Sequence, residues 1–441
     1  MGAWSFGIHL MQPKTTLQAE HTDLTSIKKQ RKTELGKINY KEKKQQVLDI
    51  KLVDPAMSKK WGLKATDAEL AWKKHNVLGS KDIVIAIIDT GLDINHPDLK
   101  NNLWVNPGEM GRDSQGRLKA NNGIDDDQNG YIDDVHGWNF VSNNNDLSDH
   151  HGHGTHISGI VGAESGNGIG ISGMAPKVSL MTLKYFDPTV SGGNNLMNTV
   201  RAIQYATLMK RKLKIKSLII NYSGGGLEES PQEKQAIIAA QKEGILLVAA
   251  AGNESSDSNV HGPQYFPADY NLSNIISVTA IDKAKNILST SNYGMNTVDI
   301  AAPGNEIYST LPGGRYGSMT GTSQATAFVT GVAALIMTKY PDFSAEKVIK
   351  HITQTGDKET KKLAGKTRYQ TRLNTYRALA FQDQGVNFNG SVALNTPRGI
   401  NSIGGNTTFS SDPNLSYPET GQTADGIAQF SRSMKTLLNE K

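Results

Sequence analysis

Short apolar runs alternate with helical patterns from about residue 81 to about residue 380. The run at residues 83–88 is continuous, β-branched and bounded by polar residues, as expected for a strand buried on both faces of a parallel sheet. This alternation predicts a three-layer, doubly wound α/β fold with a mostly parallel sheet and helices on both of its faces. Its functional site should lie beyond the carboxyl ends of the strands. The other predicted strands are residues 178–183, 217–221, 245–251 and 275–278, with predicted helices at residues 195–210 and 231–243.

Both ends of the chain depart from this pattern. Residues 1–53 hold an interrupted apolar stretch and then a Lys-rich arm, whereas Asn, Gly, Ser, Thr and Pro dominate beyond about residue 380. The apolar stretch lacks the positive start and the small-residue cleavage site of a secretory signal, so we interpret it as a weak or truncated signal or a propeptide remnant. We expect three parts: an N-terminal extension over 1–53, a folded domain over 54–380 and a polar, flexible tail over 381–441.

The 441-residue chain has a net charge of +5, which is concentrated near its start. Between Lys28 and Lys51 there are nine basic and three acidic residues, a surplus of +6 that leaves the remainder at about −1. A solvated helix is the first interpretation of this arm, with a propeptide remnant and a nucleic-acid-binding arm as alternatives. Because the rest of the chain is nearly neutral, we expect no nucleic-acid partner.

Two further classes are excluded by composition. No apolar run approaches the roughly 18 residues that a membrane helix needs, so no membrane span is expected. The chain contains no Cys. Disulfide scaffolds, thiolate catalysis and zinc sites built on Cys are therefore excluded.

Two polar motifs stand where an α/β fold carries its chemistry. Asp89 ends the first predicted strand in an Asp-Thr-Gly motif. An aspartic protease would need a second such motif, which the sequence lacks. His153 lies within a run of four His that also includes His150, His151 and His156, but the spacing and the missing Glu do not fit a zinc protease. We expect His153 to begin a helix, where the neutral imidazole of a general base is favoured.

Ser323 and Asn253 complete the candidate chemistry. Ser323 precedes a run of small and apolar residues typical of a buried helix, so its hydroxyl would lie beside unpaired backbone N–H groups that stabilise an oxyanion. An isolated Ser there is more commonly a helix cap. Asn253 follows a predicted strand and can present an amide to the same oxyanion, although a lone Asn after Gly is commonly a turn residue.

Four motifs in this order resemble the subtilisin-type serine proteases over about residues 54–380. They are Asp89-Thr90-Gly91 with His96-Pro97-Asp98-Leu99, His153-Gly154-Thr155-His156, Ala251-Gly252-Asn253 and Gly321-Thr322-Ser323. The resemblance implies that Ser323 is the nucleophile, His153 its general base and acid, and Asp89 the residue that orients the imidazole. It also implies an oxyanion hole formed by Asn253 and the N–H of Ser323.

The resemblance further implies a peptide-binding groove. Ser223, Gly224 and Gly225 would pair with an extended substrate by main-chain hydrogen bonds. Ala251, Gly252 and Tyr265 would border the pocket for the substrate side chain before the scissile bond (P1), which Tyr265 would narrow. One departure from the family pattern is Gln324, which stands where Met usually follows the nucleophile.

The segment 122–134 is the strongest metal signal in the sequence. Oxygen-bearing side chains alternate along it, and Gly130 supplies a sharp turn, which suits Ca²⁺. An acidic surface turn is the alternative interpretation. The twelfth position is His136, where an EF-hand has Glu, so Asp134 is expected to close the coordination shell instead. The predicted ligands are Asp125, Asp127, Asn129, the Tyr131 carbonyl and Asp134.

A second calcium site is implied only by the resemblance. The segment 168–173 matches a dinucleotide fingerprint, but it follows a polar loop and not a strand, so we reject that function. In the resembled family this loop wraps Ca²⁺. The implied ligands are the Asn167 side chain, the carbonyls of Ser165, Ile169 and Ile171, and the carboxylates of Asp98 and Asp54.

We therefore expect a Ca²⁺-stabilised serine endopeptidase that acts on proteins through an acyl-enzyme. The alternative is a catalytically silent relative that serves as a protein-binding module, for which the altered surroundings of Ser323 are the only support. The resemblance implies a secreted, periplasmic or cell-surface location, and we expect a monomer.

Overall fold

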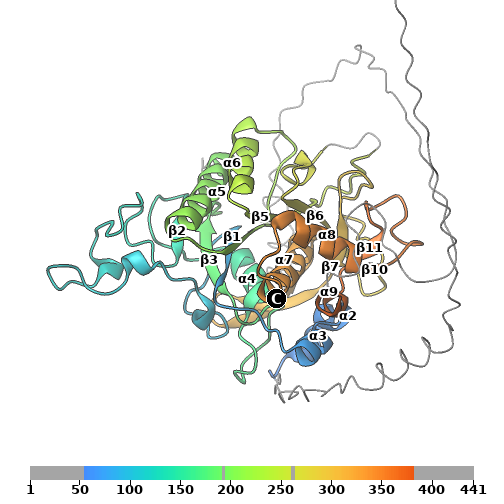
Figure 1. Cartoon of the computed structure of the whole chain (residues 1–441), viewed down its shortest axis with the longest axis horizontal. Helices are drawn as coiled ribbons and strands as arrows, with labels where there is room; N and C mark the ends of the chain where they lie inside the picture. Colours follow the sequence, from blue (N-terminus) through green and yellow to red (C-terminus); the bar gives the residue numbers. More distant parts are fainter. Residues whose placement is uncertain (1–53, 191–193, 260–263, 382–441) are drawn as a thin grey trace, which may run out of the picture. The chain divides into compact units, whose positions relative to one another are not determined.

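A computed structural model describes residues 54–190, 194–259 and 264–381, which all belong to one compact unit, Leu48–Lys441 (Figure 1). The predicted N-terminal extension and nearly all of the predicted C-terminal tail lie outside these residues. Within the described part of the chain, none of the helices combines the length and apolar character needed to cross a membrane.

A nine-stranded sheet forms the centre of this unit, in the order β10-β11-β7-β6-β5-β4-β1-β3-β2. Every neighbouring pair is parallel except β10 and β11. The strands are β1 (Ile83–Asp89), β2 (Gly137–Asn139), β3 (Ser179–Lys184), β4 (Ser217–Tyr222), β5 (Leu246–Ala250), β6 (Ile275–Ile281), β7 (Ile300–Pro303), β10 (Asp357–Lys358) and β11 (Thr371–Arg372).

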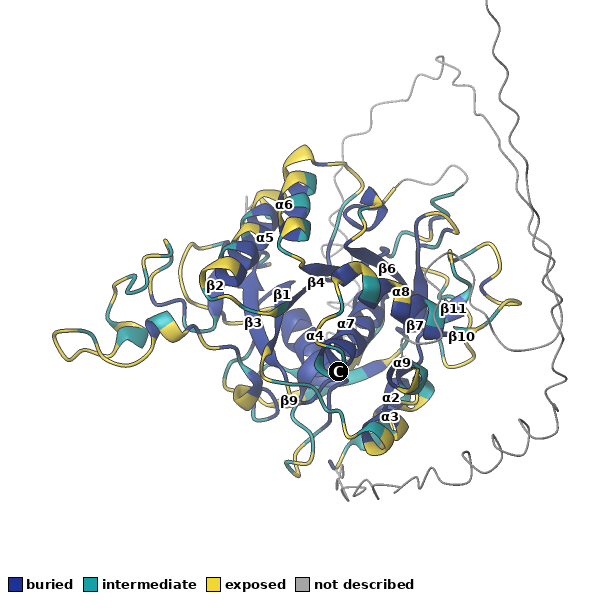
Figure 2. Ribbon diagram, viewed as in Figure 1, coloured by how far each residue is buried: buried dark blue, intermediate teal, exposed yellow. Residues whose placement is uncertain are grey.

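Two cores, one on each face of the sheet, follow from the alternation of side chains along a strand. Ile83, Ile85 and Ile87 of β1 pack with α4 and α7. Val84, Ala86 and Ile88 face the other way and pack with α5 and α6. Figure 2 shows the sheet with α4 and α7 in dark blue, whereas α5 and α6 are exposed on their outer sides. The predicted three-layer α/β fold is confirmed.

Four helices cover the sheet, and α7 is the most deeply placed. Its residues from Thr322 to Met337 are all buried, because Ala, Gly and Thr dominate its surface and allow close packing on every side. These helices are α4 (His153–Gly162), α5 (Asn195–Lys212), α6 (Pro231–Lys242) and α7 (Thr322–Lys339). The others are α2 (Trp61–Ala65), α3 (Ala68–His75), α8 (Ala345–Thr355), α9 (Thr375–Ala380) and the 3₁₀ turns Met57–Lys59, Lys100–Asn102, Pro107–Glu109, Lys119–Asn121 and Ala268–Tyr270.

An antiparallel hairpin of β8 (Ile307–Leu311) and β9 (Arg315–Met319) packs against α4. His156 on α4 contacts the Ile307 carbonyl through Nε2 at 2.9 Å, and the Ser309 hydroxyl donates to the His156 carbonyl at 2.8 Å. His156 is thus a buried core residue that is held to the hairpin through Nε2. The sequence pattern indicated neither this hairpin nor the short strands β2, β7, β10 and β11, because runs this short carry little periodicity.

Candidate active site

The candidate site lies at the carboxyl edge of the sheet where the strand order reverses. β1 and β4 are neighbours although β2 and β3 come between them in the chain, and Ile88 is aligned with Tyr222. The residues that follow, Asp89 and Ser223, therefore leave the sheet side by side. On the other side of β4, Tyr222 is aligned with Ala249 of β5. Such a switch point is where open α/β sheets bind their ligands.

Asp89 and His153 form a buried pair at this edge. His153 is the first residue of α4, and its Nδ1 lies 2.7 Å from Asp89 Oδ1. A side chain at Gly154 would come within 2.1 Å of the Gly91 carbonyl oxygen, so only glycine lets α4 begin this close to β1. In the neutral imidazole, Nδ1 donates its hydrogen to Asp89 and Nε2 is left as the base.

The pKa of His153 lies above its ordinary value of 6.5. Burial alone would lower this pKa, but the charge of Asp89, its hydrogen bond and the charge of Asp149 outweigh burial. The charges of Asp89 and Asp149 thus oppose the preference for the neutral imidazole that the sequence predicts at a helix N-terminus. The same two carboxylates stabilise the imidazolium, which is the form that His153 takes when it accepts a proton.

Ser323 is the second residue of α7, and its hydroxyl donates to the Ser223 carbonyl at 2.9 Å. Because Ser223 and Asp89 leave adjacent strands, Ser323 and His153 are anchored at neighbouring positions of one sheet edge. α4 and α7, which carry them at their first turns, pack against each other. Ser323 and the Asp89–His153 pair are thus anchored at the same edge of the sheet.

Asn253 is held beside the start of α7. Its Oδ1 accepts a hydrogen bond from the Thr322 N–H at 3.0 Å, which leaves its side-chain N–H groups as donors for a ligand. The buried amide of Asn292 fixes the loop on either side of Asn253. It donates to the Ala251 carbonyl at 2.8 Å and accepts from the Glu254 N–H at 3.0 Å.

The predicted substrate-binding segments lie around this point. Gly226, next to the segment 223–225, exchanges two main-chain hydrogen bonds with Phe266, at 2.9 and 2.8 Å. The ring of Tyr265 occupies the space between the two glycine segments, because a Cβ on Gly225 or Gly252 would lie 2.4 or 2.8 Å from its ring atoms. Tyr265 is buried, with 4% of its surface exposed. The Tyr265 ring thus lies between the two segments that the sequence analysis assigns to substrate binding.

Comparison with known proteins assigns this arrangement to a family. Residues 80–385 match the model of the subtilase family, Peptidase_S8. The chain belongs to this family. Thermitase from Thermoactinomyces vulgaris is 34% identical over 326 residues, which cover 74% of this chain and 97% of thermitase. The major intracellular serine protease of Bacillus subtilis is 36% identical over 279 residues, 62% of this chain and 74% of that protein. Subtilisin DY of Bacillus licheniformis is 35% identical over 274 residues, 62% and 83% of the two chains.

This subtilase is a serine endopeptidase by family, as the sequence predicted. Its nucleophile helix contains one unusual residue, Gln324, directly after Ser323. Gln324 is fully buried, and neither its side-chain oxygen nor its nitrogen has a hydrogen-bond partner among the described residues. Unpartnered buried amide atoms destabilise a protein by roughly 1–3 kcal/mol per group.

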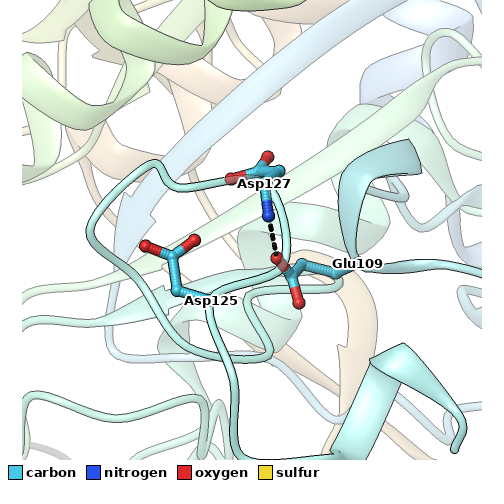
Figure 3. Close-up of side chains that lie close together, drawn as sticks. All are labelled: Glu109, Asp125 and Asp127. Atoms are coloured by element: carbon cyan, nitrogen blue, oxygen red, sulfur yellow. Dashed lines mark hydrogen bonds between the residues drawn. The ribbon is translucent and has the colours of Figure 1, made fainter. Parts of the chain in front are cut away.

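The subtilase also has an acidic cluster in the segment that projects from the sheet, drawn in cyan in Figure 1. Carboxylate oxygens of Glu109, Asp125 and Asp127 lie within 4.8 Å of one another. Figure 3 shows the three side chains around one small space, with the Asp127 N–H donating to Glu109. Burial, reinforced by the neighbouring carboxylates, raises the pKa of Glu109 to about 7.

The other predicted members of this cluster are placed differently. Asp134 is enclosed by the side-chain amides of Asn106 and Asn129 at 2.7 and 2.8 Å, and by the Tyr205 hydroxyl. The oxygen of Asn129 accepts from the Tyr131 N–H at 2.7 Å. Asp134 is thus held by three neighbouring side chains. The third carboxylate that lies beside Asp125 and Asp127 is Glu109, which the sequence analysis did not identify.

The second predicted ion loop is held together by hydrogen bonds. Asp98 accepts from the Asn167 amide and the Ile171 N–H, both at 2.9 Å. Asp54 accepts from the Gly166 N–H at 3.0 Å and from the Ser172 hydroxyl, whose oxygen lies 3.0 Å from the Ser165 hydroxyl and can accept its hydrogen. The Ile169 N–H donates to Asn167. The structure gathers all six predicted residues at one loop, with both carboxylates already occupied by donors.

We predict that Gln324→Met stabilises this subtilase. The substitution removes both unpartnered amide atoms and fills the same space with an apolar side chain. The free energy of unfolding is expected to rise by about 1–3 kcal/mol, measured by urea denaturation of Ser323→Ala protein so that self-digestion does not interfere. An unchanged or lower stability would show that Gln324 is satisfied in solution.

Proposed function

We propose that Asp89, His153 and Ser323 form the catalytic triad of this endopeptidase, with Asn253 and the Ser323 N–H as its oxyanion hole. The observation that carries the proposal is the 2.7 Å contact between Asp89 and His153. Asp89 lies at the end of β1, and Ser223, which accepts the hydrogen bond from Ser323, follows the adjacent strand β4. The two contacts are anchored on adjacent strands, so the base and the nucleophile share one edge of a rigid sheet.

In this mechanism Ser323 Oγ attacks the scissile carbonyl carbon while its proton moves to His153 Nε2. Asp89 stabilises the imidazolium, and Asn253 with the Ser323 N–H stabilises the negative oxygen of the tetrahedral intermediate. The intermediate collapses to an acyl-enzyme as His153 returns the proton to the leaving amine. Water then gives a proton to His153 as it attacks the ester, and His153 returns that proton to Ser323 when the acid leaves.

We propose that the substrate lies extended along Ser223, Gly224 and Gly225 on one side and Ala251 and Gly252 on the other. Main-chain groups of strand-edge segments pair with an extended peptide whatever its side chains. The buried ring of Tyr265 fills the space between the segments. This placement favours small P1 side chains such as Gly and Ala.

We propose that the acidic cluster binds one structural Ca²⁺. Glu109 Oε2 and Asp127 Oδ1 are buried without a hydrogen-bond partner among the described residues, although Lys212 Nζ lies 3.4 Å from the Asp127 oxygen. An all-oxygen donor set that is short of positive charge suits a hard divalent ion. Glu109, Asp125 and Asp127 would hold it, and the ion would neutralise their mutual repulsion. Asn129, the Tyr131 carbonyl and Asp134 remain predicted ligands beside these three.

The second loop is a weaker candidate for calcium. Asp54 and Asp98 with Ser165, Asn167, Ile169 and Ile171 remain its predicted ligands, and their convergence supports the proposal. An ion would have to displace some of the hydrogen bonds that now occupy both carboxylates.

We propose further that residues 54–380 form the peptidase unit, that the protein acts as a monomer, and that it works outside the cytoplasm. The family match at residues 80–385 supports the first of these. The location rests on resemblance, and the relatives include one that is intracellular by name.

A fluorophosphonate probe tests the nucleophile. The calcium-loaded wild type is expected to be labelled, whereas Ser323→Ala is not. Asn253→Ala should still be labelled, with kcat reduced by about 10²–10³ because one oxyanion donor is lost. A folded wild type that resists labelling would overturn the peptidase proposal in favour of a catalytically silent binding module.

Calcium binding is tested by the melting temperature of Ser323→Ala protein with and without chelator. Free calcium at about 100 times its dissociation constant should stabilise the fold by about 2.7 kcal/mol. Glu109→Gln is expected to remove most of this increment. The matched control is Glu233→Gln, since Glu233 is also buried and its pKa is also raised by burial to about 7, but it lies on α6. Equal calcium responses in both variants would contradict the proposed site.

The Tyr265 proposal is tested with peptides that differ only at P1. Tyr265→Gly should open the space between the two glycine segments and raise the ratio of kcat/KM for Phe over Ala at P1 at least about tenfold. Tyr270→Phe, a change in a nearby buried tyrosine, is the control and should leave the ratio unchanged. The same ratio in Tyr265→Gly and wild type would remove Tyr265 from the specificity pocket.

A further inference from the structure

A second buried carboxylate, that of Asp149, lies close to the proposed triad. Only 7% of the surface of Asp149 is exposed. Resting on the triad proposed above, we propose that Asp149 is a positioning residue of the catalytic centre. Through Thr90 and the first turn of α4 it fixes His153 against Asp89.

Both oxygens of Asp149 are fully used in this arrangement. Oδ1 accepts from the Thr90 hydroxyl at 2.8 Å and from the N–H groups of His151 and Gly152 at 3.1 and 2.7 Å. Oδ2 accepts from the N–H and the hydroxyl of Thr155, at 2.8 and 2.7 Å. These donors come from the residues on both sides of His153 and from the end of β1.

Thr90 links Asp149 to the Asp89–His153 pair. Its N–H donates to Asp89 Oδ1 at 2.8 Å, the same oxygen that meets His153. Its hydroxyl accepts from the Gly154 N–H at 2.9 Å while donating to Asp149. The two residues flanking the proposed catalytic groups, Thr90 after Asp89 and Gly154 after His153, are therefore joined directly. Because the Thr90 hydroxyl donates its hydrogen to Asp149, its oxygen is left to accept from the Gly154 N–H.

Helix capping alone does not account for this arrangement. The N-cap of α4 is Gly152, whose residue type provides no side-chain cap. The helices α5, α6, α8 and α9 are capped by neutral side chains, namely those of Asn194, Ser230, Ser344 and Asn374. A buried carboxylate is more costly to desolvate than these neutral caps, and Asp149 also accepts from the Thr90 hydroxyl, which is not part of α4.

The charge of Asp149 also acts on the imidazole. The groups that interact electrostatically with His153 are Asp89 from β1, Asp149 and His151 from the preceding loop and His156 from α4. Asp187, which pairs with Lys184 at the end of β3, acts on His151. Both Asp89 and Asp149 raise the pKa of His153. Loss of Asp149 therefore lowers this pKa, and the neutral base persists to lower pH.

The experiment compares Thr90→Val, Thr90→Ser and Asp149→Asn in the full chain with calcium. Thr90→Val is expected to lower kcat about tenfold with little change in KM, because the base is displaced while the substrate groove is intact. Thr90→Ser keeps the hydroxyl and should restore kcat. In Asp149→Asn the acidic limb of the pH profile of kcat/KM should move to lower pH, with kcat reduced.

Ser344→Ala serves as the control for a purely structural effect. It removes the N-cap of α8, because the Ser344 hydroxyl accepts from the Lys347 N–H. It should lower the melting temperature without moving kcat or the pH limb. If Thr90→Val and Asp149→Asn behave like this control, the positioning role is overturned. If Asp149→Asn does not fold, the proposal is tested by the kcat of the two Thr90 variants. Equal kcat values for Thr90→Val and Thr90→Ser would then overturn it. A wild type without activity would refute the triad proposal, and this is seen before any variant is made.

Discussion

The alignment of β1 with β4 is the constraint on which the rest of the site depends. Ile88 lies opposite Tyr222, so one backbone register decides that Asp89 and Ser223 leave the sheet together. A slip of one residue would turn every side chain of β1 to the other face and exchange the contents of the two cores. The Ile and Val residues that pack on both faces therefore also hold the proposed catalytic groups in place.

Buried polar groups cluster around this register, and several of them are held by hydrogen bonds. Asp89 faces an imidazole, Asp149 accepts five hydrogen bonds, and Asn292 spans the loop that carries Asn253. In a low-dielectric interior such satisfied networks are rigid, which keeps donors and acceptors aimed before substrate arrives. Gln324 differs from these three residues, because neither amide atom of its buried side chain has a hydrogen-bond partner in the described part of the chain.

The sequence was sufficient for the fold class, the long strands and the order of the four motifs, because these depend on local patterns. It did not indicate the residues that act through tertiary contacts. Thr90 and Asp149 are 59 positions apart, and the contact between Glu109 and Asp127 spans 18. Asn292 lies 41 positions from the carbonyl it supports. Side chains of this kind have no fixed spacing to the motif they serve, so a single chain read in order does not reveal them.

The buried position of α7 also affects the order in which the protein folds during synthesis. This helix packs on β1, β4, β5, β6 and β7, strands that all precede it along the chain. During synthesis the sheet edge can be assembled while the segment with Ser323 is still being made, and the helix enters only after the surfaces that receive it exist. A nascent chain thus contains the proposed base and its carboxylate long before it contains the proposed nucleophile in its final position. Hydrolytic competence is then one of the last properties that the growing chain acquires.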